Sequence, residues 1–475
     1  MTPIDVLHDD DLLAIFDFYV VRLGPGKRYA QRKRDIEAWQ SLVHVCRRWR
    51  CLVFASPRRL DLRLVCTPGT STRERLYIWP SLPLIVDGNI IHEYFKSVRV
   101  DNFIVALGHR DRICRIDLRI TQGSAWNEVL ATMKVSFPAL THLLLECGLS
   151  PAPIIPDSFL NGYAPRLKYL SMEFIPFPGI AKLLLSATHL VHLSLTGIPH
   201  SGYISPKAMA ALLSVLSSLK TFTLGFYFPQ SRPERESRSL HPPKRSILPA
   251  LYCLGFSGVA EYLEELVTRI DTPELNTVDI DITFIDQIDF DCPRLAQFIN
   301  CTPTLRALDE ARVQFHLCTT NVKLRYRTFE FLDNVTVSIH ISYREPDQRL
   351  SPVSQVCNSF LHTISTVEDL YIEHKDSQLV LKNDAVENTL WLQLLLPFTA
   401  AKNLYLSKKL GPGIAAALQE LVRGRIAEVL PSLQNIFVEG LGPSGLLREN
   451  IEQFVAARQL SGHHVAISDW PSAPI

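Results

Sequence analysis

The chain has 475 residues, 47% of them hydrophobic and 20% charged, so it is long enough to bury a large core or several smaller ones along a repeat array. Its 49 basic and 48 acidic side chains nearly cancel, which argues against a global field that would attract nucleic acid or an anionic membrane. The start, MTPIDVLHDDDLL, lacks the basic and apolar parts of a secretory signal, and no run of about 18 apolar residues follows. We expect a cytoplasmic or nuclear protein without nucleic-acid or membrane partners.

Cysteine usage and catalytic motifs exclude further classes. The ten cysteines are scattered without a CxxC pair, which favours reduced core thiols over disulfide bonds or a zinc site. The sequence has no GxSxG, GxxxxGK[ST] or HExxH motif, and we expect no GxGxxG motif after a strand. We therefore expect no catalytic residues, no metal site and no cofactor, and an enzyme with an unrecognised site is the least favoured interpretation.

The region from about residue 110 to residue 440 repeats a short phrase in which a proline or small residue precedes Leu-x-x-Leu-x-Leu. Clear copies begin at residues 137, 164, 187, 217, 248, 272, 365, 400 and 430. Within each run of copies, the final apolar residues follow one another at intervals of about 23 to 34 residues, which fits one short strand and one return helix. These residues are Leu145, Met172, Leu195, Leu224, Phe256, Ile280, Ile372, Leu406 and Val438, with a weaker early member at Leu118.

The phrase degrades between Ile280 and Ile372. In TPTLRALDEARV, Glu310 stands where the last apolar residue is expected, and NVTVSIHIS only suggests a strand near Ile339. Elsewhere the Leu-x-Leu alternation places apolar side chains on one face of a strand and polar side chains on the other. The segment 204–219 carries apolar residues at helical spacing, so we expect it to form a return helix.

These phrases resemble leucine-rich repeats, although the asparagine or cysteine ladder that is common after the strand is mostly missing. The resemblance implies an α/β fold: a curved leucine-rich repeat solenoid with a parallel sheet on its inner face. We expect residues 89–475 to form this irregular repeat domain and residues 63–88 to connect it to an N-terminal helical segment, 1–62. The polar stretch 229–246 is interpreted as an exposed loop between repeats, with a partner contact as the alternative.

The N-terminal segment contains two amphipathic stretches. VLHDDDLLAIFDFYVVRL predicts a helix capped by Asp9 or Asp10. AWQSLVHVCRRWRCLVFASP predicts a second helix that ends before Pro57. A basic insert, residues 22–34, lies between them and is interpreted as a solvated loop, with a nuclear-localisation patch as the alternative.

The two stretches resemble the F-box, a three-helix motif that binds the Skp adaptor of cullin-type ubiquitin ligases. VCRRWRCLVFASP followed by RRLDLRL carries the most specific part of the likeness, which extends to the large F-box family of mushroom-forming fungi. His8 replaces the proline that usually begins the first helix, and the basic insert lengthens the connection. The residues that the resemblance assigns to adaptor binding are Leu7, Leu12, Ile15, Phe16, Leu42, Val45, Cys46, Trp49, Leu52 and Pro57.

The resemblance implies a non-catalytic substrate receptor of a Skp–cullin–F-box ubiquitin ligase, whose repeats hold an unknown target protein. Of the adaptor residues, Leu12, Phe16, Val45 and Leu52 are expected to face the adaptor, whereas Trp49 anchors the motif internally. One alternative is a ligase-independent repeat scaffold, in which the N-terminal helices merely cap the array. We expect target contacts from exposed strand residues: Thr141, His142, Lys168, Tyr169, His192, Lys220, Thr221, Asn276 and Asp279.

Overall fold

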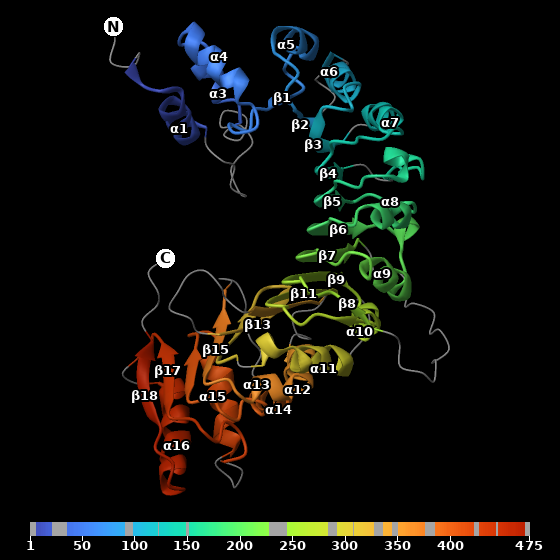
Figure 1. Cartoon of the computed structure of the whole chain (residues 1–475). Coiled ribbons are helices and arrows are strands. Elements are labelled where there is room, and N and C mark those ends of the chain that lie inside the picture. The colour runs from blue at the N-terminus through green and yellow to red at the C-terminus, as the bar shows by residue number, and fades with distance from the viewer. Residues whose placement is uncertain are drawn as a thin grey trace. The chain divides into compact units, whose positions relative to one another are not determined.

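The computed structural model of the chain places its helices and strands in two compact units, Met1–Tyr203 and Ile204–Ile475, which are described separately. Figure 1 labels their elements along the chain. The structure describes residues 6–20, 36–90, 98–121, 123–148, 152–227, 245–283, 292–306, 308–326, 336–343, 350–375, 385–421, 427–442 and 445–470. The basic insert 22–34 and nearly all of the polar stretch 229–246 therefore lie outside the described residues.

The first unit begins with helices and continues as alternating strands and helices. The opening helices are α1 (Asp9–Tyr19), α3 (Trp39–Val43) and α4 (Arg47–Ala55). The strands are β1 (Leu64–Cys66), β2 (Leu84–Ile90), β3 (Ile113–Ile120), β4 (His142–Cys147), β5 (Tyr169–Glu173) and β6 (His192–Ile198). Between and after them lie α5 (Thr72–Ile78), α6 (Val98–Leu107), α7 (Gly123–Thr132), α8 (Ile180–Ser186) and the short 3-10 helices η2 (Phe159–Gly162) and η3 (His200–Gly202).

The predicted second helix is wrong, because the stretch 38–57 forms two helices. The first of these helices ends at Val43, and the chain is extended at Cys46, the N-cap of the second. The Cys46 thiol accepts a hydrogen bond from the backbone N–H of Trp49 at 3.4 Å and so caps α4. The capping prediction for the first helix is also wrong: the cap is His8, whose backbone N–H donates to Asp11 at 3.2 Å.

The predicted connection 63–88 is also corrected, since it contains β1, α5 and most of β2. Residues Leu64, Val65 and Cys66 pair with Leu84–Val86 in a parallel ladder, and β2 pairs in turn with β3. The repeat array therefore begins about 25 residues earlier than the sequence pattern indicates. The weak phrase explains the error, because LRLVC and LPLIVDG are short apolar runs without the Leu-x-x-Leu-x-Leu pattern.

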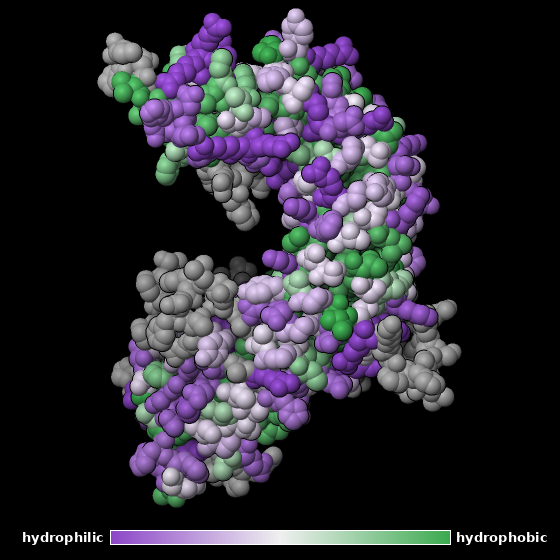
Figure 2. Space-filling model, viewed as in Figure 1, coloured by the Kyte–Doolittle hydropathy of each residue, from purple (hydrophilic) through white to green (hydrophobic). Residues whose placement is uncertain are grey.

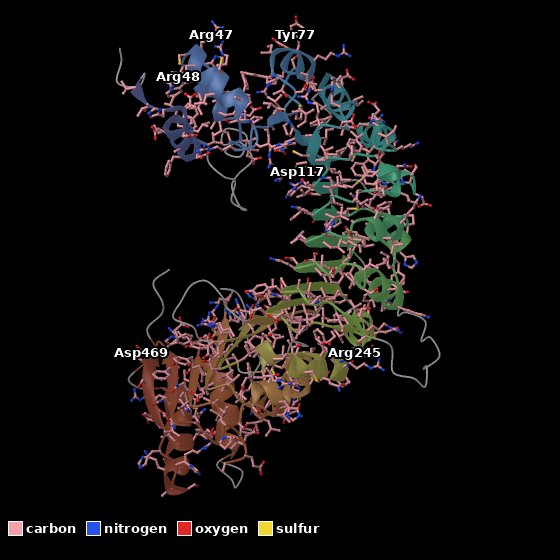
Figure 3. The ribbon with its side chains drawn as sticks, viewed as in Figure 1. Arg47, Arg48, Tyr77, Asp117, Arg245 and Asp469 are labelled. Carbon is pink, nitrogen blue, oxygen red and sulfur yellow. The ribbon has the colours of Figure 1, made fainter. Side chains whose placement is uncertain are left out.

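Parallel pairing in the first unit confirms the register that the repeated phrase predicts. Leu118, Leu145, Met172 and Leu195 lie directly side by side on four neighbouring strands. Their side chains are buried, whereas the residues immediately before and after them in each strand are at least partly exposed. Helices α6, α7 and α8 cover the buried side of the sheet, and the opposite side is open (Figure 1). Asp117, labelled in Figure 3, lies on that open face.

The second unit continues the same plan with more variation. Its strands are β7 (Thr221–Phe226), β8 (Ser246–Ile247), β9 (Cys253–Gly258), β10 (Ile270–Asp271), β11 (Thr277–Thr283), β12 (Glu310–Phe315), β13 (Thr319–Arg325), β14 (Thr336–Ser342), β15 (Asp369–His374), β16 (Asn403–Leu406), β17 (Asn435–Glu439) and β18 (Ala466–Trp470). Its helices are α9 (Pro206–Leu213), α10 (Ala260–Val267), α11 (Pro293–Cys301), η4 (Pro303–Leu305), α12 (Leu350–Ser359), α13 (Leu361–Ile364), α14 (Ala385–Leu395), α15 (Gly411–Glu420) and α16 (Leu446–Leu460). The predicted helix 204–219 is thus shorter than expected.

The degraded region is where the sheet departs from the predicted all-parallel form. Strand β13 runs antiparallel to both of its neighbours, β12 and β14, so the spatial order is β11-β14-β13-β12-β15. The marker was expected at the position of Glu310, but Val313 is the residue in register with Ile372. The marker residues Ile372, Leu406 and Val438 then resume in parallel register, as predicted.

A turn immediately before many of the strands explains the first half of the repeated phrase. The backbone N–H of Leu140 donates to Phe137, that of Leu167 to Ala164, and that of Leu275 to Thr272, each across three residues. A proline or small residue fits such a turn, and the leucine that ends it is buried in each of these three cases. Both units therefore have leucine-rich repeat architecture, with a strand and a return segment in most repeats.

Candidate partner-binding surfaces

The N-terminal helices form a small core of their own, which revises the predicted adaptor face. Leu12, Phe16 and Leu42 are buried in it, and the rings of Phe16 and Trp49 lie 4.8 Å apart. Leu12 and Phe16 were expected to face an adaptor, but both side chains are fully buried in this core. Trp49 contacts this core through Phe16 but remains partly exposed.

Polar contacts hold α1 against α4. The guanidinium of Arg48 donates to the backbone carbonyl of Leu7 at 2.6 Å and pairs with Asp9 at 2.7 Å. Arg59 makes a second bridge to Asp17 at 3.2 Å. Arg48 is labelled in Figure 3 beside α4. The basic residues of the F-box-like phrase therefore have a structural role in joining its two halves.

Other apolar side chains of the segment are exposed. Ile15, Phe18 and Tyr19 lie on one face of α1 because they are three and four residues apart, and Phe18 is 90% exposed. Val45 and Cys46 are exposed at the break between α3 and α4, while Leu7, Leu52 and Pro57 are partly buried. The sequence analysis missed Phe18, although its spacing of three from Ile15 is a helical signal.

The helical segment is attached to the first repeat. A carboxylate oxygen of Glu37 accepts the backbone N–H of Val65 at 2.9 Å, and Arg75 donates to the carbonyl of the same residue at 2.8 Å. Arg75 also pairs with Glu37 at 2.8 Å. These two side chains take the place of a neighbouring strand along the open edge of β1. The rings of Trp39 and Trp79 pack 5.1 Å apart across the same junction.

The open face of the first unit brings five of the predicted target residues together. His142, Tyr169 and His192 lie side by side on β4, β5 and β6. Their rings stack, with centroids 5.9 Å apart for the first pair and 4.0 Å for the second. Thr141 and Lys168 precede His142 and Tyr169 in the chain, and Lys168 is exposed.

The hydrogen bonds of Thr141 define the tautomer of His142. The Thr141 hydroxyl donates its proton to the carbonyl of Cys114 at 2.9 Å, so it accepts from the Nδ1–H of His142 at 2.9 Å. Burial, together with the charges of Arg115, Arg63 and Lys168, lowers the pKa of His142 to about 4. Burial also lowers the pKa of His192. Both imidazoles are therefore neutral at pH 7.

The remaining predicted target residues belong to the second unit. Lys220 is exposed, and Thr221 is the first residue of β7. Asn276 is buried and bonded to the phenol of Tyr252, so it is wrongly predicted as an exposed contact. Asp279 is exposed and pairs with His340 at 3.3 Å, and this hydrogen bond raises the pKa of His340.

A second cluster on the open face of the second unit was not singled out from the sequence. Tyr371, Tyr405 and Phe437 stack face to face across β15, β16 and β17, with centroids 4.1 and 4.6 Å apart. Trp470 lies against the two tyrosines, and Arg312 covers the other face of Tyr371 at 4.2 Å. The signal was present, because each stacked ring directly precedes a marker residue of the phrase: Ile372, Leu406 or Val438.

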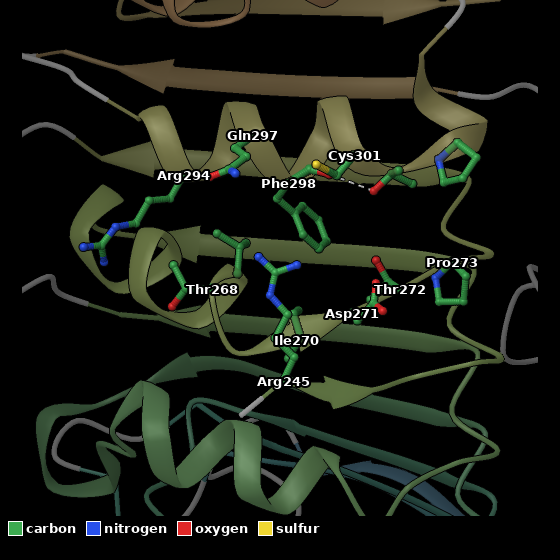
Figure 4. Close-up of a pocket in the computed structure, with 13 residues that line it drawn as sticks. Arg245, Thr268, Ile270, Asp271, Thr272, Pro273, Arg294, Gln297, Phe298 and Cys301 are labelled. Carbon is green, nitrogen blue, oxygen red and sulfur yellow. Dashed lines mark hydrogen bonds between the residues drawn. The ribbon is translucent and has the colours of Figure 1, made fainter. Parts of the chain in front are cut away.

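A cavity of about 190 Å³ lies on the helix side of the second unit, between α10, β10 and α11 (Figure 4). Arg245, Arg294 and Phe298 contribute to its lining, and the buried hydroxyl of Thr272 has no hydrogen-bond partner among the described residues. No histidine is among the described residues that line the cavity, so these residues offer no imidazole base to activate a nucleophile such as Cys301. We assign it no chemistry.

Two further features bear on enzyme-like interpretations. A GxGxxG pattern at 440–445 follows β17 directly, so the expectation that no such motif follows a strand is wrong. Part of the pattern lies outside the described residues. Asp469 of β18 accepts the backbone N–H of Leu441 at 3.1 Å and is thus engaged in closing this loop. Within the described ranges, no cluster of three potential metal ligands occurs.

The cysteines differ in burial. Cys66, Cys147, Cys292 and Cys357 are buried as predicted, whereas Cys46, Cys51, Cys301 and Cys318 are exposed, so core packing does not account for all ten.

No helix in the described part of the chain has both the length and the apolar character needed to cross a bilayer. On the side shown in Figure 2, hydrophobic side chains reach the surface in small groups among hydrophilic ones.

Comparisons with known proteins find likenesses among solved structures. No family model and no curated protein matches the chain. Among solved structures, the chain is similar to the leucine-rich repeat-containing protein LegL7 from Legionella pneumophila, with 12% sequence identity. The match covers 83% of this chain and 97% of that chain, with a TM-score of 0.28. The strand register and the return helices of this chain, rather than this likeness, establish the repeat architecture.

Proposed function

We propose that this chain is a non-catalytic adaptor, in which the N-terminal helices bind the Skp adaptor of a cullin-type ubiquitin ligase and the repeats hold a target protein. The observation that carries the proposal is the three-helix segment itself. It has its own core, yet leaves Ile15, Phe18, Tyr19 and Val45 exposed. Apolar side chains of this size contribute roughly 1.5 to 3 kcal/mol each when a partner buries them.

The break at Cys46 supports the same proposal. The F-box resemblance implies three helices, and the break turns the predicted pair of helices into α1, α3 and α4. The attachment of Glu37 to Val65 holds the segment on the first repeat, so an adaptor bound there would keep a fixed position relative to β1. A target held by the repeats would then be presented to the ligase at a high effective concentration.

The proposal is tested by co-purification of the full chain with the Skp adaptor of its own organism. The variant Ile15→Asp/Phe18→Asp/Val45→Asp changes only exposed positions, and we expect it to reduce adaptor binding at least tenfold. Tyr77→Asp is the matched control, because Tyr77 is an aromatic residue that is 91% exposed on α5, outside the motif. Equal binding by the triple variant and the wild type would refute this docking face.

The second candidate function is a ligase-independent interaction scaffold. It is favoured by the Glu37, Val65 and Arg75 contacts, which make the helical segment a cap on the edge of the sheet. A solenoid needs such a cap whether or not an adaptor binds. Failure of the folded wild-type chain to bind the adaptor at micromolar concentrations would select this function.

A further inference from the structure

One row of side chains on the open face of the second unit joins cationic and aromatic residues. Lys323 lies beside Arg312, which lies beside Tyr371, and the row continues through Tyr405 to Phe437. These residues come from five neighbouring strands: β13, β12, β15, β16 and β17. All five side chains are partly exposed. We call this set the mixed row.

The aromatic half of the mixed row has the composition of an interface centre. Tyrosine, tryptophan and arginine carry a large share of the binding energy in protein interfaces. Face-to-face stacking within the ladder leaves ring edges for a partner, while a hydrogen bond joins the side chains of Tyr371 and Tyr405. Trp470 packs across the ladder, 5.5 Å from Tyr405 and 5.8 Å from Tyr371.

The cationic half presents positive charge because its carboxylates are covered. Glu310 is bonded to Arg312 at 2.5 Å and to Arg325 at 2.6 Å, and its side chain is only 4% exposed, against 34% for Arg325. Glu373 is 8% exposed beneath Lys375, whose side chain is 50% exposed. The solvent side of this network is therefore made of guanidinium and ammonium groups, and Lys323 extends it along the row.

We propose that the mixed row is the target-contact surface, and that the target segment it takes is acidic and carries aromatic or large aliphatic side chains. The inference rests on the proposed function, in which the repeats hold a protein target. Charge complementarity determines the sign of the partner: carboxylates would pair with Lys323, Arg312, Arg325 and Lys375. Apolar side chains would pack against Tyr405, Phe437 and Trp470, which lie on the adjacent strands.

The alternative explanation is that the row only stabilises the sheet. Cross-strand aromatic pairs contribute about 0.2 to 1 kcal/mol each without any partner. A purely structural row would show no preference for acidic ligands, and a charge reversal at its edge would leave all binding unchanged. The experiment below separates the two explanations.

The test is a selection of random linear peptides displayed on phage against the full-length chain. We expect the enriched peptides to combine Asp or Glu with Phe, Tyr, Trp or Leu. A selected peptide, synthesised with a fluorophore, should bind Lys323→Glu at least about tenfold more weakly than wild type in anisotropy titrations. Phe437→Thr should weaken it to a similar degree. Raising the salt concentration should also weaken it, because part of the attraction is between exposed charges.

The matched control is Lys207→Glu, the same charge reversal at an exposed position on the return helix α9. We expect it to bind the peptide like wild type. Enrichment of basic or uncharged peptides, no enrichment at all, or loss of binding in Lys207→Glu but not in Lys323→Glu would overturn the proposal. Adaptor co-purification with Lys323→Glu reports separately on the proposed function, because this residue is not part of the helical segment.

Discussion

The carboxylate of Glu37 and the backbone N–H of Val65 form a hydrogen bond of 2.9 Å that closes the open edge of the first strand. Arg75 completes the closure by donating to the carbonyl of Val65 at 2.8 Å. Open sheet edges are sites of unwanted strand pairing, and proteins often cover them with charged side chains or helices. In this chain the Glu37–Arg75 ion pair covers the edge with charged side chains. Glu37 also joins the N-terminal helices to the sheet.

The edge closure predicts a local loss of stability in Glu37→Ala. A hydrogen bond to a charged group contributes about 1.5 to 3 kcal/mol, and both partners here are mostly buried. We expect the amides of residues 64–66 to exchange with deuterium about tenfold faster or more, measured by mass spectrometry on a peptide that covers β1. Glu74→Ala, which removes an exposed acid on α5, should leave this exchange rate unchanged. Unchanged exchange in Glu37→Ala would contradict the closure.

The buried guanidinium of Arg458 predicts a large loss of stability in Arg458→Met. Arg458 is fully buried and donates to the carbonyls of Val429 at 2.6 Å and Leu430 at 2.9 Å. Methionine fills much of the space but leaves these carbonyls without donors, so we expect the free energy of unfolding to fall by about 2 to 4 kcal/mol. Urea denaturation measures this change. Arg448→Met, at an exposed helical ion pair with Glu452, should change it by less than about 0.5 kcal/mol.

The neutral state of His142 predicts a pH dependence of stability. Its pKa is about 4 in the folded chain, against about 6.5 when unfolded, so the unfolded state binds more protons between these values. Stability therefore falls as the pH falls from about 6.5 towards 4. Between pH 8 and pH 5, the wild type should lose about 2 kcal/mol more than His142→Gln. His189→Gln, at an exposed position, should follow the wild type, and an identical pH profile for His142→Gln would disprove the assignment.

The backbone at Gly197 predicts that no side chain is tolerated there. Its φ is +60°, and a Cβ atom would lie 2.6 Å or less from two ring atoms of Phe174. Left-handed backbone with a Cβ costs roughly 1 to 2 kcal/mol, and the displacement of the ring adds to this cost. We expect Gly197→Ala to lower the free energy of unfolding by more than about 2 kcal/mol. Gly69→Ala, with open space around the added atom, should be nearly neutral, and equal effects would count against the strain.

Some corrections to the sequence-based expectations have a common physical origin. The break at Cys46 could not be read from periodicity, because an apolar face at helical spacing is compatible with one helix or with two. The cap became visible only when the thiol of Cys46 was found to accept from Trp49. Likewise, Leu12 and Phe16 are apolar in any interpretation, and only packing decides whether such side chains face a neighbouring helix or a partner.

The mixed row was not predicted because the expected marker position in the degraded region, Glu310, is wrong. Aligning the phrases would have placed Tyr371, Tyr405 and Phe437 in one row, since each precedes a marker residue. Arg312 belongs to that row because Val313 is in register with Ile372, but the expectation of a marker at Glu310 obscured it. The antiparallel strand that brings Lys323 beside Arg312 breaks the repeat, so periodicity could not predict it.

The sequence by itself determined the repeat and its register, because alternating Leu-x-Leu residues have only one way to bury their apolar side next to identical neighbours. It also determined which strand residues lie on the open face, since polar side chains in such a strand must point away from the core. Only the tertiary structure decided which of those residues meet. Most of the stacked rings, the pairing of Arg312 with Glu373 and the closure of β1 join residues of different strands and helices. These contacts depend on how the chain returns between strands rather than on any local pattern.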